Sequence, residues 1–221
     1  MYIMEKRAEE YRTVTDTAQG QIIEKKSKFI ATIYHVETEQ EAISVIEAAK
    51  KQYWDARHNC YAYILGENSQ IMRFSDDGEP SGTAGKPILE ILKTKGLTDT
   101  LVVVTRYFGG VLLGTGGLIR AYGDATIKAV DNAGEAGSLV RMCLMRELTI
   151  RTDYTLSGKV QYVLSESEAV VSDTVYDEAV SFKIAAFLHD EDAIKHKITD
   201  VTNGKAEIVS GEVKYIAVRD R

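Results

Sequence analysis

A glycine-rich stretch at residues 106–125, RYFGGVLLGTGGLIRAYGDA, has the residue types of an anion-binding turn. An apolar run precedes it and a helical pattern follows it, which is typical of a turn between a strand and a helix. Free N–H groups at the start of such a helix, together with the helix dipole, attract phosphate or carboxylate groups. Arginines on either side of the turn can add charged hydrogen bonds. The candidate anion-binding or nucleic-acid-binding residues are Arg106, Tyr107, Gly109, Gly110, Gly114, Gly116, Gly117, Arg120 and, from the preceding loop, Lys86.

The known nucleotide motifs do not fit this part of the chain. A dinucleotide fingerprint needs G-x-G-x-x-G, but Ile119 occupies the third glycine position of the stretch. A P-loop ending at Lys86 would need glycine where Pro80 stands and Ser or Thr where Pro87 stands. The turn is therefore either an anion site of another kind or a bend whose glycines permit positive φ angles and close packing.

The loop at residues 75–87, SDDGEPSGTAGKP, carries acids that can act as bases or metal ligands. An Asp- and Gly-rich turn needs no metal to explain it, and His58 and Cys60 lack a second ligand pair at zinc spacing, so we expect no metal and no cofactor. In a strand, His58 and Cys60 share one face, so they could form a thiol–imidazole pair. We favour the alternative, in which Cys60 is a small buried apolar residue. The candidate residues of this loop site are Asp76, Asp77, Glu79, Ser81, Gly82, Thr83, Gly85 and His58.

Aromatic residues and arginines interleave in the first half of the chain, a combination that can stack the bases of a single nucleic-acid strand. The alternative is that most of these rings are core residues, and we favour it for Tyr63 and Phe108. Tyr107 beside Arg106 is the exposed pair that best fits stacking. Convergence of five cations near the glycine-rich turn would supply a local basic patch: Arg57, Arg73, Lys86, Arg106 and Arg120.

The composition of the 221 residues is that of an ordinary globular protein. The formal net charge is −6 and no basic tail or arm occurs, so attraction to nucleic acid would need a local basic surface. Two cysteines make no disulfide framework and suit a reducing cytosol. The charged N-terminal residues do not fit a signal peptide, and no apolar run is long enough to cross a membrane. We expect a soluble cytoplasmic protein whose oligomeric state is open.

The elements that must position the candidate residues follow from the hydrophobic periodicity of the first half. Thr38 and Glu41 fit a capping box at the start of a helix, and one face of a later helix carries Leu118, Tyr122 and Ala125. The order is β-α-β-β-α-β-α, with or without one more strand at the start, which is typical of an α+β or α/β layer sandwich. The expected elements are one or two strands over 20–36, a helix over 38–54, a hairpin with arms 59–66 and 71–78, a helix over 88–97, a strand over 99–108 and a helix ending at Gly134.

The pattern changes after Gly137, where a second series of elements begins. Its order is β-α-β-β-α-β, which is that of a ferredoxin-like domain. We therefore expect two domains, residues 1–137 and residues 138–221. The expected elements of the second domain are a strand over 143–154, a helix over 156–167, a hairpin over 169–187, a helix over 190–204 and a strand over 205–218.

Two segments together resemble a known family. The segments FSDDGEPSGTAGKPIL and VVVTRYFGGVLLGTGGLIRAYGDA, in this order, resemble the IMPACT/YigZ family of small conserved proteins. The signature positions that match are Arg106, Tyr107, Phe108, Gly109, Gly110 and Gly114. Upstream positions that also look like those of the family are Glu24, Ser27, Phe29, His58, Cys60, Ala62 and Tyr63. The resemblance covers residues 18 to 130, and the second half resembles the C-terminal domain of the bacterial members.

The resemblance implies a fold and a context. The first domain is expected to be similar to domain 2 of ribosomal protein S5, a fold shared with elongation factor G and the GHMP kinases. The second is expected to resemble the last, ferredoxin-like domain of elongation factor G. Eukaryotic members of the family are implicated in restraining the general-control kinase, which phosphorylates a translation initiation factor. They carry an extra N-terminal protein-binding domain. For bacterial members the resemblance implies nucleic-acid or ribosome binding and transfers no catalytic residue.

Three hypotheses follow for the function. The favoured one is a non-enzymatic protein that binds RNA or the ribosome, linked to regulation of translation, with the open face of the ferredoxin-like sheet as a second binding surface. The second is an enzyme for a small phosphorylated or carboxylated substrate, with Asp77 or Glu79 as base or metal ligand and Lys86 and Arg106 as anion clamps. It requires the 75–87 loop and the glycine-rich turn to meet in one pocket. The third is a regulator that binds protein partners.

Overall fold

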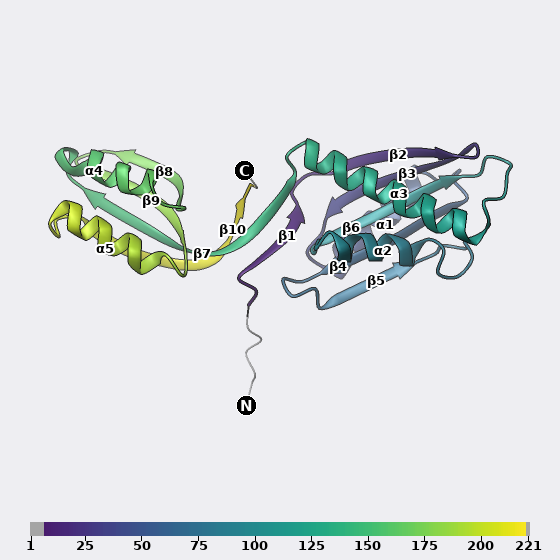
Figure 1. The fold of residues 1–221 in the computed structure, drawn as a ribbon, viewed down its shortest axis with the longest axis horizontal. Helices are drawn as coiled ribbons and strands as arrows, with labels where there is room; N and C mark the ends of the chain where they lie inside the picture. Colours follow the sequence, from purple (N-terminus) through teal and green to yellow (C-terminus); the bar gives the residue numbers. More distant parts are fainter. Residues whose placement is uncertain (1–6, 220–221) are drawn as a thin grey trace, which may run out of the picture. The chain divides into compact units, whose positions relative to one another are not determined.

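The computed structural model describes residues 7–219, which divide into two compact units. The first unit extends to Arg141 and the second runs from Met142 to Val218 (Figure 1). The division falls inside strand β7 (Leu139–Thr152), so the first unit keeps the first residues of that strand. None of the helices within 7–219 combines the length and the apolar composition needed to cross a membrane.

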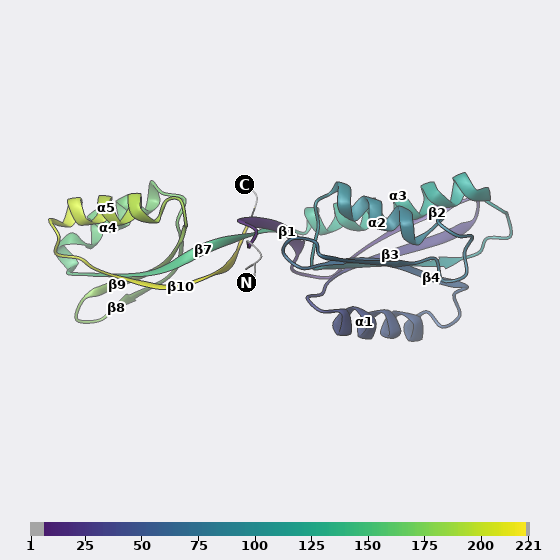
Figure 2. The same ribbon diagram turned by 90° about the horizontal axis from the view of Figure 1, so that it is seen from below.

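The first unit is a five-stranded sheet with helices on both faces. Strands run in the order β2-β3-β6-β4-β5, and each pair of neighbours is antiparallel. Helices α2 and α3 cover one face and α1 covers the other (Figure 2). The bounds are β2 (Ala18–Glu24), β3 (Ser27–His35), α1 (Glu39–Gln52), β4 (His58–Leu65), β5 (Ile71–Ser75), α2 (Gly85–Thr94), β6 (Thr100–Tyr107) and α3 (Gly114–Glu135).

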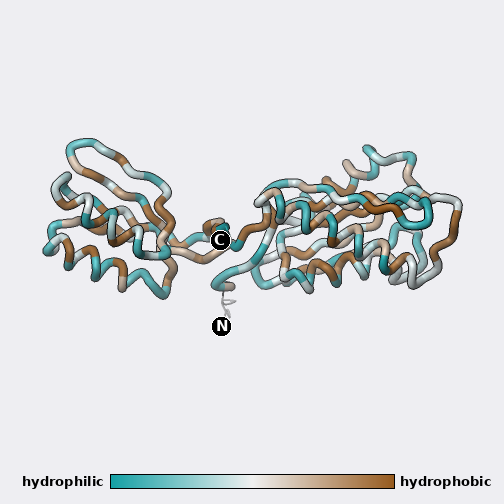
Figure 3. The backbone as a smooth tube through the Cα atoms, turned by 45° about the horizontal axis from the view of Figure 1, so that its top comes forward, coloured by the Kyte–Doolittle hydropathy of each residue, from teal (hydrophilic) through white to brown (hydrophobic). Residues whose placement is uncertain are grey.

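Local sequence accounts for most of these elements. The first seven residues of β6 are buried, as expected for a central strand made of β-branched residues. Thr38 caps α1, since its hydroxyl accepts a hydrogen bond from the N–H of Glu41 at 3.2 Å. The Glu41 carboxylate accepts from the N–H of Glu37 at 2.8 Å instead of from Thr38, which differs from the expected capping box. Along the helices, hydrophobic and hydrophilic residues alternate within each turn, which is typical of amphipathic helices (Figure 3).

Two features of the first unit differ from the prediction. Strand β1 (Glu10–Val14) was not predicted; it pairs with β7, and the N–H of Thr15 donates to the carbonyl of Ser138 at 2.8 Å. Helix α2 begins at Gly85 rather than at residue 88, because a carboxylate from the preceding loop satisfies its first N–H groups. The predicted buried face of α3 is confirmed: Leu118, Tyr122, Ala125 and Ala129 all lie in the core.

The second unit is a sheet with both helices on one face (Figure 2). The strand order is β10-β7-β9-β8, and the element order is the predicted β-α-β-β-α-β. A core forms between the sheet and the helices, with Leu148, Phe182 and Ile194 among its members. The bounds are β7 (Leu139–Thr152), α4 (Tyr154–Ser165), β8 (Val170–Tyr176), β9 (Val180–Phe187), α5 (Glu191–Thr202) and β10 (Glu207–Val218). Both units together make a mixed α/β protein of two domains.

Candidate binding cavity of the first unit

A cavity of about 360 Å³ lies where the 75–87 loop meets the glycine-rich turn. The loop contributes residues 78–80, and the turn contributes Phe108 and residues 112–115. Arg57 and His58, from the start of β4, and Arg106, near the end of β6, complete its polar wall. The two segments that sequence analysis singled out therefore line one cavity, as the enzyme hypothesis requires.

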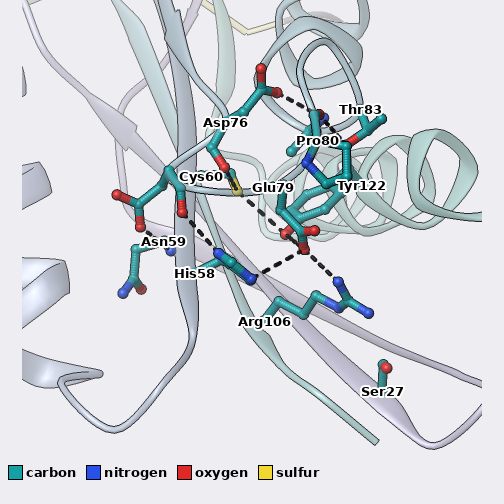
Figure 4. A network of polar contacts seen from close by, with 12 residues as sticks. Ser27, His58, Asn59, Cys60, Asp76, Glu79, Pro80, Thr83, Arg106 and Tyr122 are labelled. Atoms are coloured by element: carbon teal, nitrogen blue, oxygen red, sulfur yellow. Dashed lines mark hydrogen bonds and ion pairs between the residues drawn. The ribbon is translucent and has the colours of Figure 1, made fainter. Parts of the chain in front are cut away.

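Glu79 is the centre of a buried polar network beside this cavity. Its Oε1 accepts hydrogen bonds from Arg106 Nη1 at 2.5 Å and from the Tyr122 hydroxyl at 2.9 Å, and it lies 3.9 Å from His58 Nε2. The side chains of Glu79 and Arg106 are only 4% and 7% exposed. Figure 4 shows the three partners pointing at the carboxylate from β4, β6 and α3. The network holds the loop against the sheet and compensates the buried negative charge.

Arg106 keeps spare hydrogen-bonding capacity in this network. A guanidinium group has five N–H donors, but within residues 7–219 Nη1 is the only one of its nitrogens with a hydrogen-bond partner. Its Nε is fully buried without a partner. The group stacks near the rings of Phe29 and Phe108, at 5.3 and 5.6 Å from their centroids. Packing therefore fixes the cation at the cavity, and Nη2, which is not among the fully buried orphan atoms, has no hydrogen-bond partner within residues 7–219.

The N-terminus of α3 opens at the same cavity without a side-chain cap. Leu113 stands at the N-cap position and makes no capping hydrogen bond, and Gly114 and Thr115 line the cavity. Gly116 is exposed, and a Cβ built there would meet nothing within 4 Å. The first N–H groups of an uncapped helix carry partial positive charge and attract anions.

The other glycines of the turn have structural reasons. A Cβ at Gly109 would lie 2.0 Å from the carbonyl carbon of Lys26, so only glycine allows this close approach, and its N–H already donates to Ser27 Oγ at 3.1 Å. Gly110 and Gly114 have φ angles of +84° and +69°, which L-residues with side chains rarely adopt. Gly117 faces Leu113 closely. The structural explanation offered by the sequence therefore holds for these glycines, and anion binding at the start of α3 stays a prediction.

The acids of the 75–87 loop other than Glu79 hold the backbone in place. Asp76 accepts hydrogen bonds from the N–H groups of Gly82, Ala84 and Gly85 at 2.8, 3.0 and 2.9 Å, so it occupies the N-terminus of α2. Asp77 accepts from the N–H of Asn59 at 2.7 Å and pairs with Lys50 at 2.6 Å. Thr83 donates to the carbonyl of Pro80, and Ser81 is exposed. Neither aspartate lines the cavity, and no metal-ligand cluster occurs within residues 7–219.

His58 and Cys60 leave the same face of β4 but bind different partners. His58 Nδ1 donates to the carbonyl of Asp77 at 2.8 Å, which turns Nε2 toward Glu79. The Cys60 thiol is buried and lies 3.0 Å from the carbonyl of Asp76 and 3.3 Å from the Tyr122 hydroxyl. Burial raises the pKa of Cys60 far above its ordinary value, so the thiol stays protonated. The favoured interpretation, a small buried cysteine, fits these contacts; the thiol–imidazole pair does not form.

The five candidate cations do not converge. Arg57 and Arg106 line the cavity, but Arg120 lines a separate hollow that also includes Glu24 and Asp124. Lys86 is exposed on α2 outside the cavity. Arg73 lies on β5 and pairs with Glu39 at 3.5 Å. Convergence fails because these side chains leave separate elements: Arg73 pairs with Glu39 of α1, which covers the opposite face of the sheet from α2 and α3.

Two aromatic residues lie in environments other than those the sequence suggested. Phe108 was favoured as a core residue, but its side chain is 42% exposed and lines the cavity. Tyr107, the candidate stacking residue, lies outside the cavity and donates its hydroxyl to Asp55 at 2.9 Å. Burial raises the pKa of Tyr107 above its ordinary value. Tyr63 is buried as expected.

Comparisons with known proteins place the chain in a family. The model of the Impact N-terminal domain matches residues 25–130, and that of a domain of unknown function, DUF1949, matches residues 150–205. The IMPACT family member YvyE of Bacillus subtilis (strain 168) is 45% identical over 206 residues, which cover 93% of both chains. The chain belongs to the IMPACT family. The family member YigZ of Escherichia coli (strain K12) is 33% identical and covers 85% of this chain and 91% of its own.

A solved structure is similar over almost the whole chain. The crystal structure of a hypothetical protein is 30% identical, covers 93% of this chain and 98% of its own, and superposes with a TM-score of 0.59. The Dictyostelium discoideum protein IMPACT homolog matches over 97 residues, 42% of this chain and 28% of its own length, at 40% identity. All residues that line the cavity fall within the Impact N-terminal domain match.

In this IMPACT family protein, sequence reasoning missed the polar role of one residue. Tyr122 was predicted only as part of the buried face of α3, yet its hydroxyl donates to Glu79. A tyrosine on the buried face of a predicted helix indicates, though weakly, a polar contact in the core, because a buried hydroxyl needs a hydrogen-bond partner. Nothing in the local pattern identifies that partner, which comes from a distant loop.

The helix-free face of the second sheet was expected to offer a second binding surface. Its lysines Lys183 and Lys214 pair with Asp173 and Glu147. A small apolar cluster that includes Cys143, Met145 and Ala185 is buried. Because each of these two lysines is paired with an acidic residue, they give the helix-free face no excess positive charge.

Proposed function

We propose that this IMPACT family protein binds RNA, including ribosomal RNA, through the cavity of its first unit, and that it acts in regulation of translation in the cytoplasm. The observation that carries the proposal is the convergence of a buried, donor-rich arginine and an uncapped helix N-terminus on one cavity. The formal net charge of the chain is −6, so local convergence matters more than overall charge.

Each polar element of the cavity has a role in this proposal. The first N–H groups of α3 would hold a phosphate, as helix N-termini do in many proteins. Arg106 would donate to the same phosphate or to its neighbour, because its position is already fixed by Glu79. Arg57 is exposed at the cavity and makes no ion pair within residues 7–219, so it can add a second positive charge.

The finer fold assignments support the link to translation. We infer that the second unit is ferredoxin-like, because its strand order β10-β7-β9-β8 with both helices on one face is that of a βαββαβ sandwich. The family resemblance relates this unit to the last domain of elongation factor G and the first unit to domain 2 of ribosomal protein S5. Proteins of the translation apparatus work in contact with RNA, which agrees with a phosphate site in the first unit.

The experiment that tests the proposal places a charge at Gly116. Glutamate fits there because a Cβ meets nothing within 4 Å, and it adds a negative charge to the first turn of α3, next to the cavity-lining Gly114 and Thr115. We expect Gly116→Glu to lower the affinity for single-stranded RNA and for ribosomes at least tenfold, whereas the neutral Gly116→Gln keeps most of it. Binding is measured by fluorescence anisotropy and ribosome cosedimentation over a salt series.

Stability separates this result from misfolding. A carboxylate in the first turn of α3 stabilises the helix, and replacing a helical glycine adds further stability, so Gly116→Glu should raise the free energy of unfolding by about 1 kcal/mol. Gly123→Glu, at another open glycine seven residues along the same helix, is the matched control and should leave binding unchanged. RNA affinity of Gly116→Glu equal to that of the unchanged protein would refute the proposed site.

An enzymatic role is the second candidate, favoured by the meeting of the two loops in one cavity. Of its proposed residues, Glu79 and Arg106 line the cavity, whereas Asp77 and Lys86 do not. Incubation with small phosphorylated and carboxylated compounds, followed by mass spectrometry, distinguishes the two roles. Product that forms with the unchanged protein and not with Glu79→Gln supports an enzyme, and RNA binding without any product supports a binding protein.

A further inference from the structure

The lining of the cavity combines two kinds of chemistry. Arg106, Arg57 and the start of α3 are polar. Phe108, Leu112 and Pro80 are apolar. A ligand that satisfies both needs an anionic group and a flat or apolar group joined by a short spacer.

The apolar part of the lining contains exposed side chains. Phe108 is 42% exposed and Leu112 is 84% exposed, although both follow a strand whose first seven residues are buried. The Arg106 guanidinium lies against the Phe108 ring, so the aromatic side chain is held in position rather than free. An exposed aromatic ring supported in this way is the kind of surface on which nucleic-acid bases stack.

Glu79 adds a hydrogen-bond acceptor to the cavity lining. Its Oε1 takes all three recorded contacts, from Arg106, Tyr122 and His58, while Oε2 has no hydrogen-bond partner within residues 7–219 and is not among the fully buried orphan atoms. A carboxylate oxygen repels phosphate but accepts from hydroxyl or amino hydrogens. It therefore favours a ligand whose sugar or base, and not its phosphate, lies next to Glu79.

The size of the cavity limits how much of a strand can enter. Its volume of about 360 Å³ lies at the small end of the range of about 300–1,000 Å³ that is typical of ligand pockets. The cavity thus suits a ligand of one nucleotide's size and not a stacked run of bases.

Building on the proposed function, we infer that the cavity receives a single nucleoside monophosphate unit, with its phosphate at the N-terminus of α3 beside Arg106 and its base against Phe108. The rest of an RNA strand would leave through the exposed side of the turn. This arrangement makes base stacking on Phe108 and phosphate binding at the start of α3 two separable contributions to one binding event.

The test titrates the full-length protein with small probes by isothermal titration calorimetry. The probes are the four 5′-nucleoside monophosphates, the four nucleosides and inorganic phosphate. We expect at least one monophosphate to bind at least tenfold more tightly than its own nucleoside and than inorganic phosphate. Absence of binding by all four monophosphates, or equal binding of phosphate alone, overturns the inference.

Variants of exposed aromatic residues give the second measurement. Phe108→Ala should weaken the monophosphate and single-stranded RNA by about tenfold, the effect of one lost base stack. Phe74→Ala removes another exposed ring, on β5 and away from the cavity lining, and should leave both affinities unchanged. Circular dichroism confirms that both variants are folded. Equal affinities for Phe108→Ala and the unchanged protein contradict the inference.

The same assay separates failure of the inference from failure of the proposed function. If RNA binds and depends on Gly116 while no monophosphate binds and Phe108→Ala has no effect, the inference fails and the proposed function stands. If a monophosphate binds but neither RNA nor ribosomes do, the nucleotide site stands and RNA binding fails. A 5′-phosphorylated tetranucleotide compared with its 5′-hydroxyl form shows whether the unit comes from a strand end or from within the strand.

Discussion

The ion pair between Arg106 and Glu79 allows a quantitative prediction. Both side chains are almost fully buried, so removing the arginine leaves a carboxylate in a low-dielectric environment with the Tyr122 hydroxyl as its remaining strong donor. Breaking a buried pair from one side costs about 3–5 kcal/mol. We therefore expect Arg106→Met to lower the free energy of unfolding by about that amount, and Glu79→Gln to have a similar effect.

The double variant is the decisive measurement. Arg106→Met with Glu79→Gln removes both charges, so its cost should be well below the sum of the two single costs, with a coupling of about 3 kcal/mol. An exposed pair supplies the control: Lys93 and Glu90 are 45% and 52% exposed, and Lys93→Met should cost less than about 1 kcal/mol.

The assay follows urea unfolding of the full chain by circular dichroism. Amide hydrogen exchange of β6 peptides shows that the loss of stability lies in the first unit. A cost below about 1 kcal/mol for Arg106→Met, or strictly additive single costs, would refute the reasoning that a buried charge couple fastens the 75–87 loop to the sheet.

Two further predictions concern stability. Gly109→Ala should lower the free energy of unfolding by about 3 kcal/mol in urea titrations, because a Cβ would collide with the backbone at Lys26. A loss below about 1 kcal/mol would mean that the turn between β2 and β3 can move aside. In the second unit, hydrogen bonding and charge from Lys195, then from Arg146, lower the pKa of Glu191 below its ordinary value of 4.5. This stabilisation is complete above pH 4.5 and is lost as the pH falls, so unfolding of Glu191→Gln and of the unchanged chain should differ at pH 7 and converge at low pH; a constant difference would contradict it.

Local patterns of the sequence determined the elements of this protein. The hairpin of β4 and β5, the buried face of α3 and the βαββαβ order of the second half were readable because side-chain periodicity reports directly which face of an element is buried. Strand β1 was missed, since its five residues are stabilised by pairing with β7, a partner more than a hundred residues away.

Only the tertiary structure decided which candidate residues meet. Asp76 and Asp77 are neighbours of Glu79 in the chain, yet their carboxylates bind backbone N–H groups while that of Glu79 is buried against Arg106. Phe108 follows a buried strand but is exposed at the cavity. These outcomes depend on contacts between a loop, a strand end and a helix that are distant in sequence. Residue types and spacing identified the side chains that could bind an anion or act as acids and bases. Which of them line one cavity depended on how the loop, the strands and the helix pack together.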